Sequence, residues 1–181
     1  MEVVVALDPG MRRPGLAIFA GGTLVHAASF PEPAARRCVD RLDRAMSAAH
    51  LIYSATVEVI GDTPVDLFAS EFPQIYGAGY SEVDPNTLLP MVLQIGALAA
   101  LLACEQHRTF LPRDWTLGTS KDDGAKRRRL PSSRARLIGK NLTPREKQLY
   151  EGDADPDATD AIGIGLFALG RLRKGRVIVY E

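Results

Sequence analysis

The chain opens with an apolar run that ends in an acid, and this feature limits the fold more than any other. Residues 2–8 read EVVVALD and are followed at once by Pro9 and Gly10. A run rich in β-branched residues that stops at a turn signal predicts a central strand of a sheet. Asp8 therefore closes a strand of mostly apolar side chains, and the fold must satisfy that carboxylate.

Two more strands are expected directly after the first. Residues 15–20 (GLAIFA) and 23–30 (TLVHAASF) are apolar runs separated by Gly21 and Gly22, a pair typical of a hairpin turn. The domain is thus predicted to begin with three consecutive antiparallel strands.

The rest of the chain alternates helix and strand patterns. Apolar residues at three- and four-residue steps predict an amphipathic helix over 34–53. Residues 87–105 are apolar nearly all round and predict a helix that is either sandwiched inside the subunit or placed in a subunit interface. The other expected elements are short strands at 65–72, 108–111 and 177–180, a short helix near 132–139 in the loop-rich stretch 112–140, and helices over 144–151 and 156–172. This order predicts an α/β fold with a mixed five-stranded sheet, three antiparallel strands followed by parallel ones, flanked by helices.

Length and composition favour one ordinary globular domain. A chain of 181 residues suits a single domain over 1–181, with a basic loop and helix insertion at about 113–150. Cys38 and Cys104 fall in predicted helices and are expected to be reduced core residues. The sequence shows no signal-peptide pattern, and its longest apolar run is broken by polar and helix-breaking residues. We therefore expect no membrane partner and a cytoplasmic location, which for a viral protein would be the host-cell cytoplasm.

The net charge of zero hides a basic segment. A neutral total argues against a nonspecific nucleic-acid coat, but a local run of like charge is either a solvated face or a phosphate-binding surface. Residues 121–147 contain only three acids, Asp122, Asp123 and Glu146. The same segment contains ten basic residues: Lys121, Lys126, Arg127, Arg128, Arg129, Arg134, Arg136, Lys140, Arg145 and Lys147.

Four acids stand where an acid is costly. Asp8 and Glu71 each end a predicted core strand, and Asp157 and Asp160 lie three residues apart in the first turns of the last helix, so they share one face. A carboxylate buried alone costs several kcal/mol, and buried acids are therefore paired or bound to metal.

Simpler explanations cover only part of this set. Asp8 before Pro-Gly could start a turn, and Asp157 could favour the helix dipole. Asp160 precedes Ala-Ile-Gly-Ile-Gly, on a face that should enter the core. Taken together, the four acids are poorly explained as caps, and metal binding is the better hypothesis.

The donor types indicate the metal. All four candidates offer oxygen, and His26, His50 and His107 are scattered, so we interpret the histidines as structural. Oxygen donors favour Mg²⁺, with Mn²⁺ as a substitute, over zinc. Such carboxylates can hold two ions roughly 3.5–4 Å apart, one activating water and the other stabilising the leaving oxygen of a phosphodiester.

These motifs resemble the RuvC family of Holliday-junction resolvases. The opening LDPG at 7–10, followed by GLAI at 15–18, is similar to the family's first-strand motif. Glu71 matches the family's second acid, and DATDA at 157–161 fits its D-x-x-D-A motif. The resemblance implies an RNase H-like fold and a homodimeric, Mg²⁺-dependent endodeoxyribonuclease. It also implies two metal ions on the four acids and paired symmetric nicks in a four-way junction that leave 5′-phosphate and 3′-hydroxyl ends.

The resemblance extends to candidate DNA contacts. Tyr76, after Glu71, is a candidate for stacking on an unpaired base, although packing on the fold is an equal alternative. Lys121, in a Trp/Gly…Lys stretch, is a catalytic candidate that would stabilise charge at the scissile phosphate. The candidate phosphate contacts are Lys121, Lys126, Arg127, Arg128, Arg129, Arg134 and Arg136.

Other functions stay open at this point. An RNase H-like nuclease for flaps, other branched DNA or RNA–DNA hybrids would carry the same acids. A sugar-kinase or actin-like phosphate-binding module would need far more chain. A non-catalytic junction-binding protein would gain nothing from carboxylates that repel phosphate. The sequence does not decide the cleavage preference, the wedge residue, the dimer interface, a phage or cellular origin, or the need for a branch-migration motor.

Overall fold

A computed structural model of the protein describes residues 1–31, 40–73, 85–117, 119 and 131–172. Its strands are β1 (Val3–Asp8), β2 (Gly15–Ala20), β3 (Thr23–Ser29), β4 (Leu67–Glu71) and β5 (Gln106–Phe110). Its helices are α1 (Arg41–Ile60), α2 (Pro85–Leu102), α3 (Pro112–Thr116), α4 (Ser133–Lys140) and α5 (Pro156–Ala168), with short 3₁₀ turns at Glu146–Leu149 and Gly152–Ala154.

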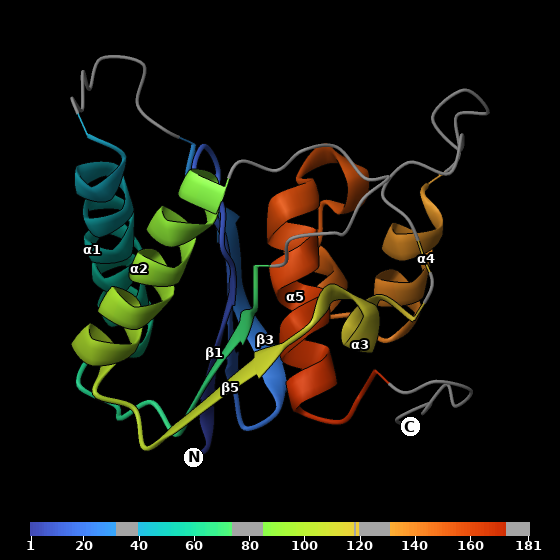
Figure 1. The fold of residues 1–181 in the computed structure, drawn as a ribbon. Helices are drawn as coiled ribbons and strands as arrows, with labels where there is room; N and C mark the ends of the chain where they lie inside the picture. Colours follow the sequence, from blue (N-terminus) through green and yellow to red (C-terminus); the bar gives the residue numbers. More distant parts are fainter. Residues whose placement is uncertain (32–39, 74–84, 118, 120–130, 173–181) are drawn as a thin grey trace.

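The five strands form one mixed sheet in the order β3-β2-β1-β4-β5 (Figure 1). β1, β2 and β3 are antiparallel neighbours, whereas β4 pairs parallel with β1 and β5 pairs parallel with β4. Gly21 and Gly22 connect β2 to β3 with φ of 56° and 75°, the left-handed conformation that a two-residue hairpin turn needs. The predicted sheet of three antiparallel strands followed by parallel ones is confirmed.

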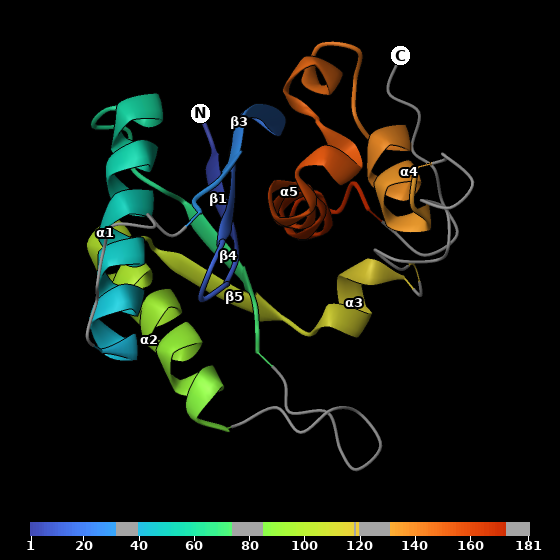
Figure 2. The same ribbon diagram turned by 90° about the horizontal axis from the view of Figure 1, so that it is seen from above.

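Helices cover both faces of the sheet. α1 and α2 pack together on one face, and α5 lies on the other with α3 and α4 beyond it (Figures 1 and 2). Because side chains alternate along a strand, Val5 and Leu7 enter the core under α1 and α2, while Val4 and Ala6 enter the core under α5. β1 is thus buried on both faces, which explains its unbroken apolar sequence.

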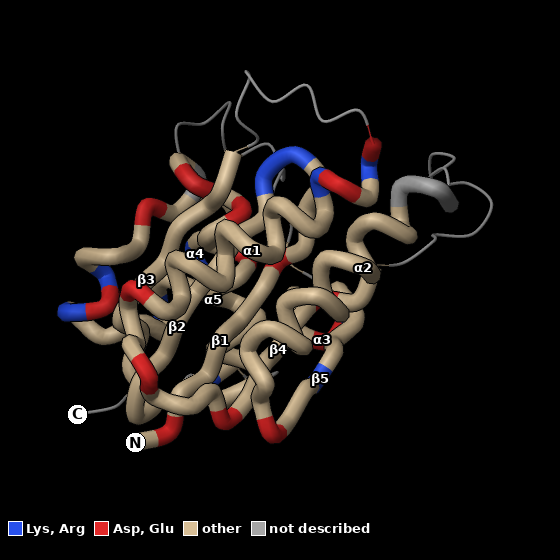
Figure 3. The backbone as a smooth tube through the Cα atoms, turned by 90° about the vertical axis from the view of Figure 1, so that its left-hand side faces the viewer, with Lys and Arg blue, Asp and Glu red and all other residues tan. Residues whose placement is uncertain are grey.

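In the layer formed by α1 and α2, the charged residues belong to α1 and lie mainly near its start (Figure 3). α2 contains no charged residue, and it exposes Leu89 and Val92 while burying Ile95 and Leu98 against the sheet. One side of α2 therefore packs inside the subunit and an apolar side faces outward, while the subunit interface stays a prediction. No helix in the described part of the chain has both the length and the apolar character to cross a membrane.

A buried ion pair joins the first hairpin to the segment after α5. The Arg171 guanidinium donates to both carboxylate oxygens of Glu146, at 2.6 and 2.8 Å, and these two residues are 7% and 0% exposed. The backbone N–H of Leu24 also donates to Glu146, and Arg171 donates to the carbonyls of Gly22 and Asn141. Burial alone would raise the pKa of Glu146, but these hydrogen bonds and that of Thr143 lower its pKa from 4.5 to about 2.

Several predicted boundaries were wrong for local reasons. The helix expected at 34–53 is Arg41–Ile60, because Asp40 caps its start by accepting from the N–H of Leu42 and the chain turns only at Gly61. The capping box of Thr143 and Glu146 forms as expected, but it opens a 3₁₀ turn, not the helix predicted over 144–151.

Other boundaries differ by a turn or less. The expected strand 65–72 is Leu67–Glu71, strand 108–111 is Gln106–Phe110, helix 87–105 is Pro85–Leu102, and helix 156–172 ends at Ala168. Cys104 consequently follows α2 instead of lying in it. α3 lies in a stretch expected to be loop, because Pro112 at its first turn and Asp114 bonding back to the N–H of Leu111 start a helix. The strand expected at 177–180 and Cys38 lie outside the described residues.

Candidate active site

Two of the four predicted acids meet at the carboxyl end of the central strands. β1 and β4 run parallel with Leu7 opposite Ser70, so the final residues Asp8 and Glu71 are adjacent at the same edge of the sheet. Side-chain alternation places Asp8 on the face of Ala6, and Glu71 on the corresponding face of β4. Both acids therefore belong to the face that α5 covers.

The first turns of α5 reach the same edge. Gly15 pairs with Asp8 in the sheet, and the backbone of α5 lies so close to Gly15 that a Cβ there would overlap the carbonyl oxygen of Asp157. Asp160, one turn further along, is only 3% exposed. The fold thus brings the ends of β1 and β4 and the first turns of α5 to the same edge of the sheet.

Trp115 and Arg134 together connect Glu71 to Asp160. The indole Nε1–H of Trp115 donates to Glu71 Oε2 at 2.8 Å. The Arg134 guanidinium lies 5.1 Å from the centroid of the Trp115 ring and pairs with Asp160 Oδ2 at 2.9 Å. Trp115 can lie this close to α5 because residue 163 is glycine, where a Cβ would stand 2.7 Å from the ring.

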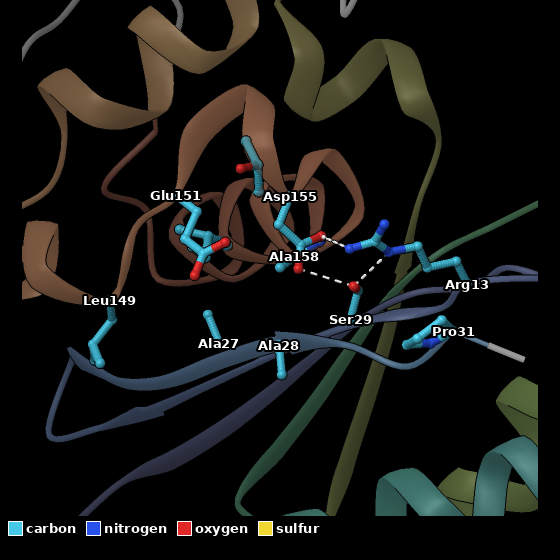
Figure 4. A pocket seen from close by; sticks show the side chains of 11 residues that line it. Arg13, Ala27, Ala28, Ser29, Pro31, Leu149, Glu151, Asp155 and Ala158 are labelled. Carbon is cyan, nitrogen blue, oxygen red and sulfur yellow. Dashed lines mark hydrogen bonds and ion pairs between the residues drawn. The ribbon is translucent and has the colours of Figure 1, made fainter. Parts of the chain in front are cut away.

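Arg13 pairs with acids on the other side of the α5 start (Figure 4). Its Nη2 lies 3.4 Å from Asp155 Oδ1, and its Nε lies 3.6 Å from Asp157 Oδ2. Ser29 joins this group by accepting from Arg13 and donating to Asp155. Arg13, Ser29 and Asp155 line a pocket of about 320 Å³ between β3 and α5. Asp155 also caps α5 by accepting from the N–H of Ala158, so its role is structural.

The donor set suits a hard divalent cation, although the carboxylates have protein partners in this conformation. Asp8, Glu71, Asp157 and Asp160 offer only oxygen, which Mg²⁺ and Mn²⁺ prefer. A carboxylate as buried as Asp160 requires a cation beside it, and here Arg134 provides one. Within the described ranges, no three Asp, Glu, His or Cys side chains are grouped closely enough to hold a metal.

Comparison with known proteins identifies the fold. No family model and no curated protein sequence matches the chain. Among solved structures, RuvC from T. thermophilus in complex with a Holliday junction substrate aligns over 94% of this chain and 98% of its own, with a TM-score of 0.58 and 14% identity. The chain has the fold of RuvC. A second T. thermophilus RuvC structure aligns over 93% of this chain and 97% of its own, with a TM-score of 0.51 and 14% identity. The predicted RNase H-like fold class is confirmed.

Only two of the predicted DNA contacts, Arg134 and Arg136, lie in the described part of the chain. Arg136 is exposed on α4, whereas Arg134 points to Asp160. The remaining candidates lie outside the described residues: Tyr76, Lys121, Lys126, Arg127, Arg128 and Arg129. Their roles stay predictions.

Two histidines have structural surroundings in this RuvC fold. The ring of His107 stacks on Phe68 with centroids 4.8 Å apart, and its Nε2 lies 3.3 Å from Ser70 Oγ. Phe68 enters the core under α1 and α2, so His107 lies on the opposite face from Glu71. Burial lowers the pKa of His107, and it also lowers the pKa of His26, where Glu58 opposes the shift.

Three residues that shape this edge of the RuvC fold had weak or misleading signals in the sequence. Trp115 was noted only as part of a motif, although it is the single tryptophan of the chain. Arg13 follows the Pro-Gly turn after Asp8, and that position was its only signal. Arg134 was assigned to phosphate, because a basic run gives no sign of which member turns inward.

Gly15→Ala should displace the start of α5. The added methyl group would overlap the backbone of Asp157, which no side-chain rotation can relieve. We expect the free energy of unfolding to fall by about 1–3 kcal/mol, the usual cost of overpacking, as measured by chemical denaturation. Gly96→Ala is the matched control, because a Cβ added at this helical glycine would meet no atom within 4 Å outside its own helix. This variant should therefore lose no stability. An undiminished unfolding energy in Gly15→Ala would contradict this close contact.

Proposed function

We propose that the chain is a Holliday-junction resolvase, a structure-specific endodeoxyribonuclease that uses two Mg²⁺ or Mn²⁺ ions. One observation carries the proposal: within a RuvC fold, Asp8 and Glu71 end adjacent parallel strands, and the acids of α5 reach the same edge. Fold alone does not define activity, but acids at this edge are the residues that two-metal hydrolysis requires.

All four acids would hold the metal ions in the proposed reaction. Asp8 and Glu71 would hold the ions from the rigid strand ends, while Asp157 and Asp160 would hold them from α5. When bound, the divalent ions supply Lewis-acid chemistry, which activates water and neutralises charge on the phosphodiester. Lys121 would add positive charge near the scissile phosphate. The strand ends orient their carboxylates because both strands are hydrogen-bonded inside the sheet.

Branched DNA is the proposed substrate, bound by the basic segment and read by its shape. Tyr76 is proposed to stack on an unpaired base. The proposed phosphate contacts are Lys121, Lys126, Arg127, Arg128, Arg129 and Arg136.

Neutralising the run Arg127–Arg129 with glutamine should weaken junction binding and flatten its salt dependence. Each lost phosphate contact removes about 0.9 from the slope of log K against log salt concentration. We therefore expect a slope smaller by about 2–3 in binding titrations at several salt concentrations. Arg108→Gln, on the exposed surface of β5, should leave the slope near the wild-type value. An unchanged slope in the triple variant would exclude this segment from the DNA interface.

A homodimer is part of the proposal, because symmetric nicks on two strands require two active sites. The outward apolar side of α2, with Leu89 63% and Val92 45% exposed, is the proposed subunit contact.

The deciding experiment is incubation with a synthetic four-way junction, with and without Mg²⁺. Two nicks at symmetric positions that appear only with Mg²⁺ would support the proposal in full. Faster cutting of a flap or of an RNA–DNA hybrid would retain the nuclease but replace its substrate. Absence of cutting on every substrate would reject the enzyme.

A second candidate is a junction-binding protein without catalysis. Two observations favour it. Asp160 pairs with Arg134 and Asp157 pairs with Arg13. Among the described residues, no three Asp, Glu, His or Cys side chains lie close enough together to hold a metal ion. Such a protein would bind the four-way junction with equal affinity with or without Mg²⁺ and leave its strands intact.

A further inference from the structure

The carboxylate of Asp160 needs a positive partner wherever it lies in the reaction cycle. Asp160 is 3% exposed and belongs to a helix whose neighbouring residues Ala161 and Ile162 are core residues. An uncompensated charge there would cost several kcal/mol. An ionised Asp160 is therefore stable at this position only beside a positive group.

Arg134 is that cation in this structure, and it is held firmly. Besides its 2.9 Å ion pair with Asp160, its Nη2 donates to the carbonyl of Thr119 at 3.3 Å, and its side chain is only 15% exposed. Its helix α4 is anchored at the start, where Ser132 Oγ accepts from the N–H of Ala135, a buried residue. Arg134 is therefore a fixed internal charge and not a solvated surface arginine.

Trp115 connects this charge to a second acid of the site. Its ring lies under the Arg134 guanidinium, and its Nε1–H donates a hydrogen bond to Glu71 Oε2. Trp115 thus donates to one of these carboxylates and Arg134 to the other. The Arg134–Trp115 contact therefore connects Asp160 to Glu71.

We propose that Arg134 is a positioning residue that serves as an internal counter-cation, which neutralises Asp160 until a divalent ion displaces it. The inference rests on the proposed function, because it assumes that Asp160 and Glu71 are metal ligands. Arg134 and the metal compete for one carboxylate, so Arg134 weakens metal binding and stabilises the metal-free protein. Trp115 would report on the exchange, since its ring contacts the Arg134 guanidinium and its indole donates to Glu71, another proposed ligand.

The test is a metal titration read by fluorescence and by thermal unfolding, without a nuclease assay. Trp115 is the single tryptophan, so its emission reports directly on the group that donates to Glu71. We expect Arg134→Gln to bind Mn²⁺ and Mg²⁺ about tenfold more tightly than the wild type, which corresponds to about 1.4 kcal/mol at 25 °C. Its Tm without metal should be lower, and metal should raise that Tm more than in the wild type.

Two further variants keep the test decisive. Arg134→Lys retains the charge but lacks the planar fork, so its metal affinity should fall between those of the wild type and Arg134→Gln even where the latter folds poorly. Lys140→Gln removes one charge from the exposed end of the same helix and should leave metal affinity and Tm unchanged.

The outcomes separate this inference from the proposed function. Equal or weaker metal binding in both Arg134 variants would overturn the inference, whether or not the wild type cuts junctions. Failure of every variant to bind metal would overturn it as well. Tighter metal binding by Arg134→Gln than by the wild type would support the counter-cation. If the wild type also binds junctions but leaves them intact, the proposed nuclease activity would be rejected while this inference stands.

Discussion

Asp8→Asn should reduce four-way junction cleavage by about 10³-fold or more, equivalent to about 4 kcal/mol of transition-state stabilisation. Asp8 ends the central strand and is adjacent to Glu71, so its carboxylate belongs to the core of the proposed metal site. The amide keeps the size of the side chain but removes the negative charge that attracts a divalent ion. Binding of the junction should change little, because phosphate contacts dominate affinity. Single-turnover cleavage and a binding titration on the same DNA measure the two effects.

Asp62→Asn is the matched control for this experiment. Asp62 is exposed in the turn between α1 and β4, at the opposite end of the sheet from Asp8, and its amide variant should cut at the wild-type rate. Cleavage by Asp8→Asn at the wild-type rate would remove Asp8 from the mechanism. A variant that also loses junction binding would show that Asp8 acts in the fold and not in the chemistry.

Arg171→Met should lower the free energy of unfolding by about 3–5 kcal/mol, the usual loss when one partner of a buried pair is removed. Glu146 is fully buried and takes two hydrogen bonds from Arg171, so methionine would leave its charge without a counter-ion. The hairpin contact at Gly22 would be lost as well. Urea denaturation at neutral pH measures the change. Arg145→Met, an exposed arginine beside Glu146, should shift the unfolding energy by less than about 0.5 kcal/mol.

The same pair gives the protein a defined response to acid. The pKa of Glu146 is lowered from 4.5 to about 2, so its stabilising contribution is complete above about pH 4.5 and is lost as pH falls toward 2. Arg171→Met should lose this part of the acid transition, because it removes the strongest cause of the lowered pKa. An identical decline of stability between pH 4.5 and 2 in both proteins would contradict the assignment to Glu146.

Local sequence patterns predicted the sheet and placed Asp8 and Glu71 at the ends of two of its strands. Apolar alternation and turn residues report local burial, and they gave β1, β2 and β3 nearly to the residue. Parallel strands that end at one edge then bring Asp8 and Glu71 together, since topology alone aligns their carboxyl ends. Helix ends were less certain, as α1 shows, because capping by Asp40 competes with a hydrophobic pattern that extends on both sides.

Which charged and polar side chains pair could not be predicted from local sequence patterns. Trp115 and Glu71 are 44 residues apart, Arg134 and Asp160 are 26 apart, and Glu146 and Arg171 are 25 apart. Periodicity shows that a side chain is buried, but it does not name the partner, because long-range pairs depend on how helices dock on the sheet. The basic run therefore predicted a single DNA-binding surface. In the structure, however, Arg134 points inward because it pairs with the buried carboxylate of Asp160.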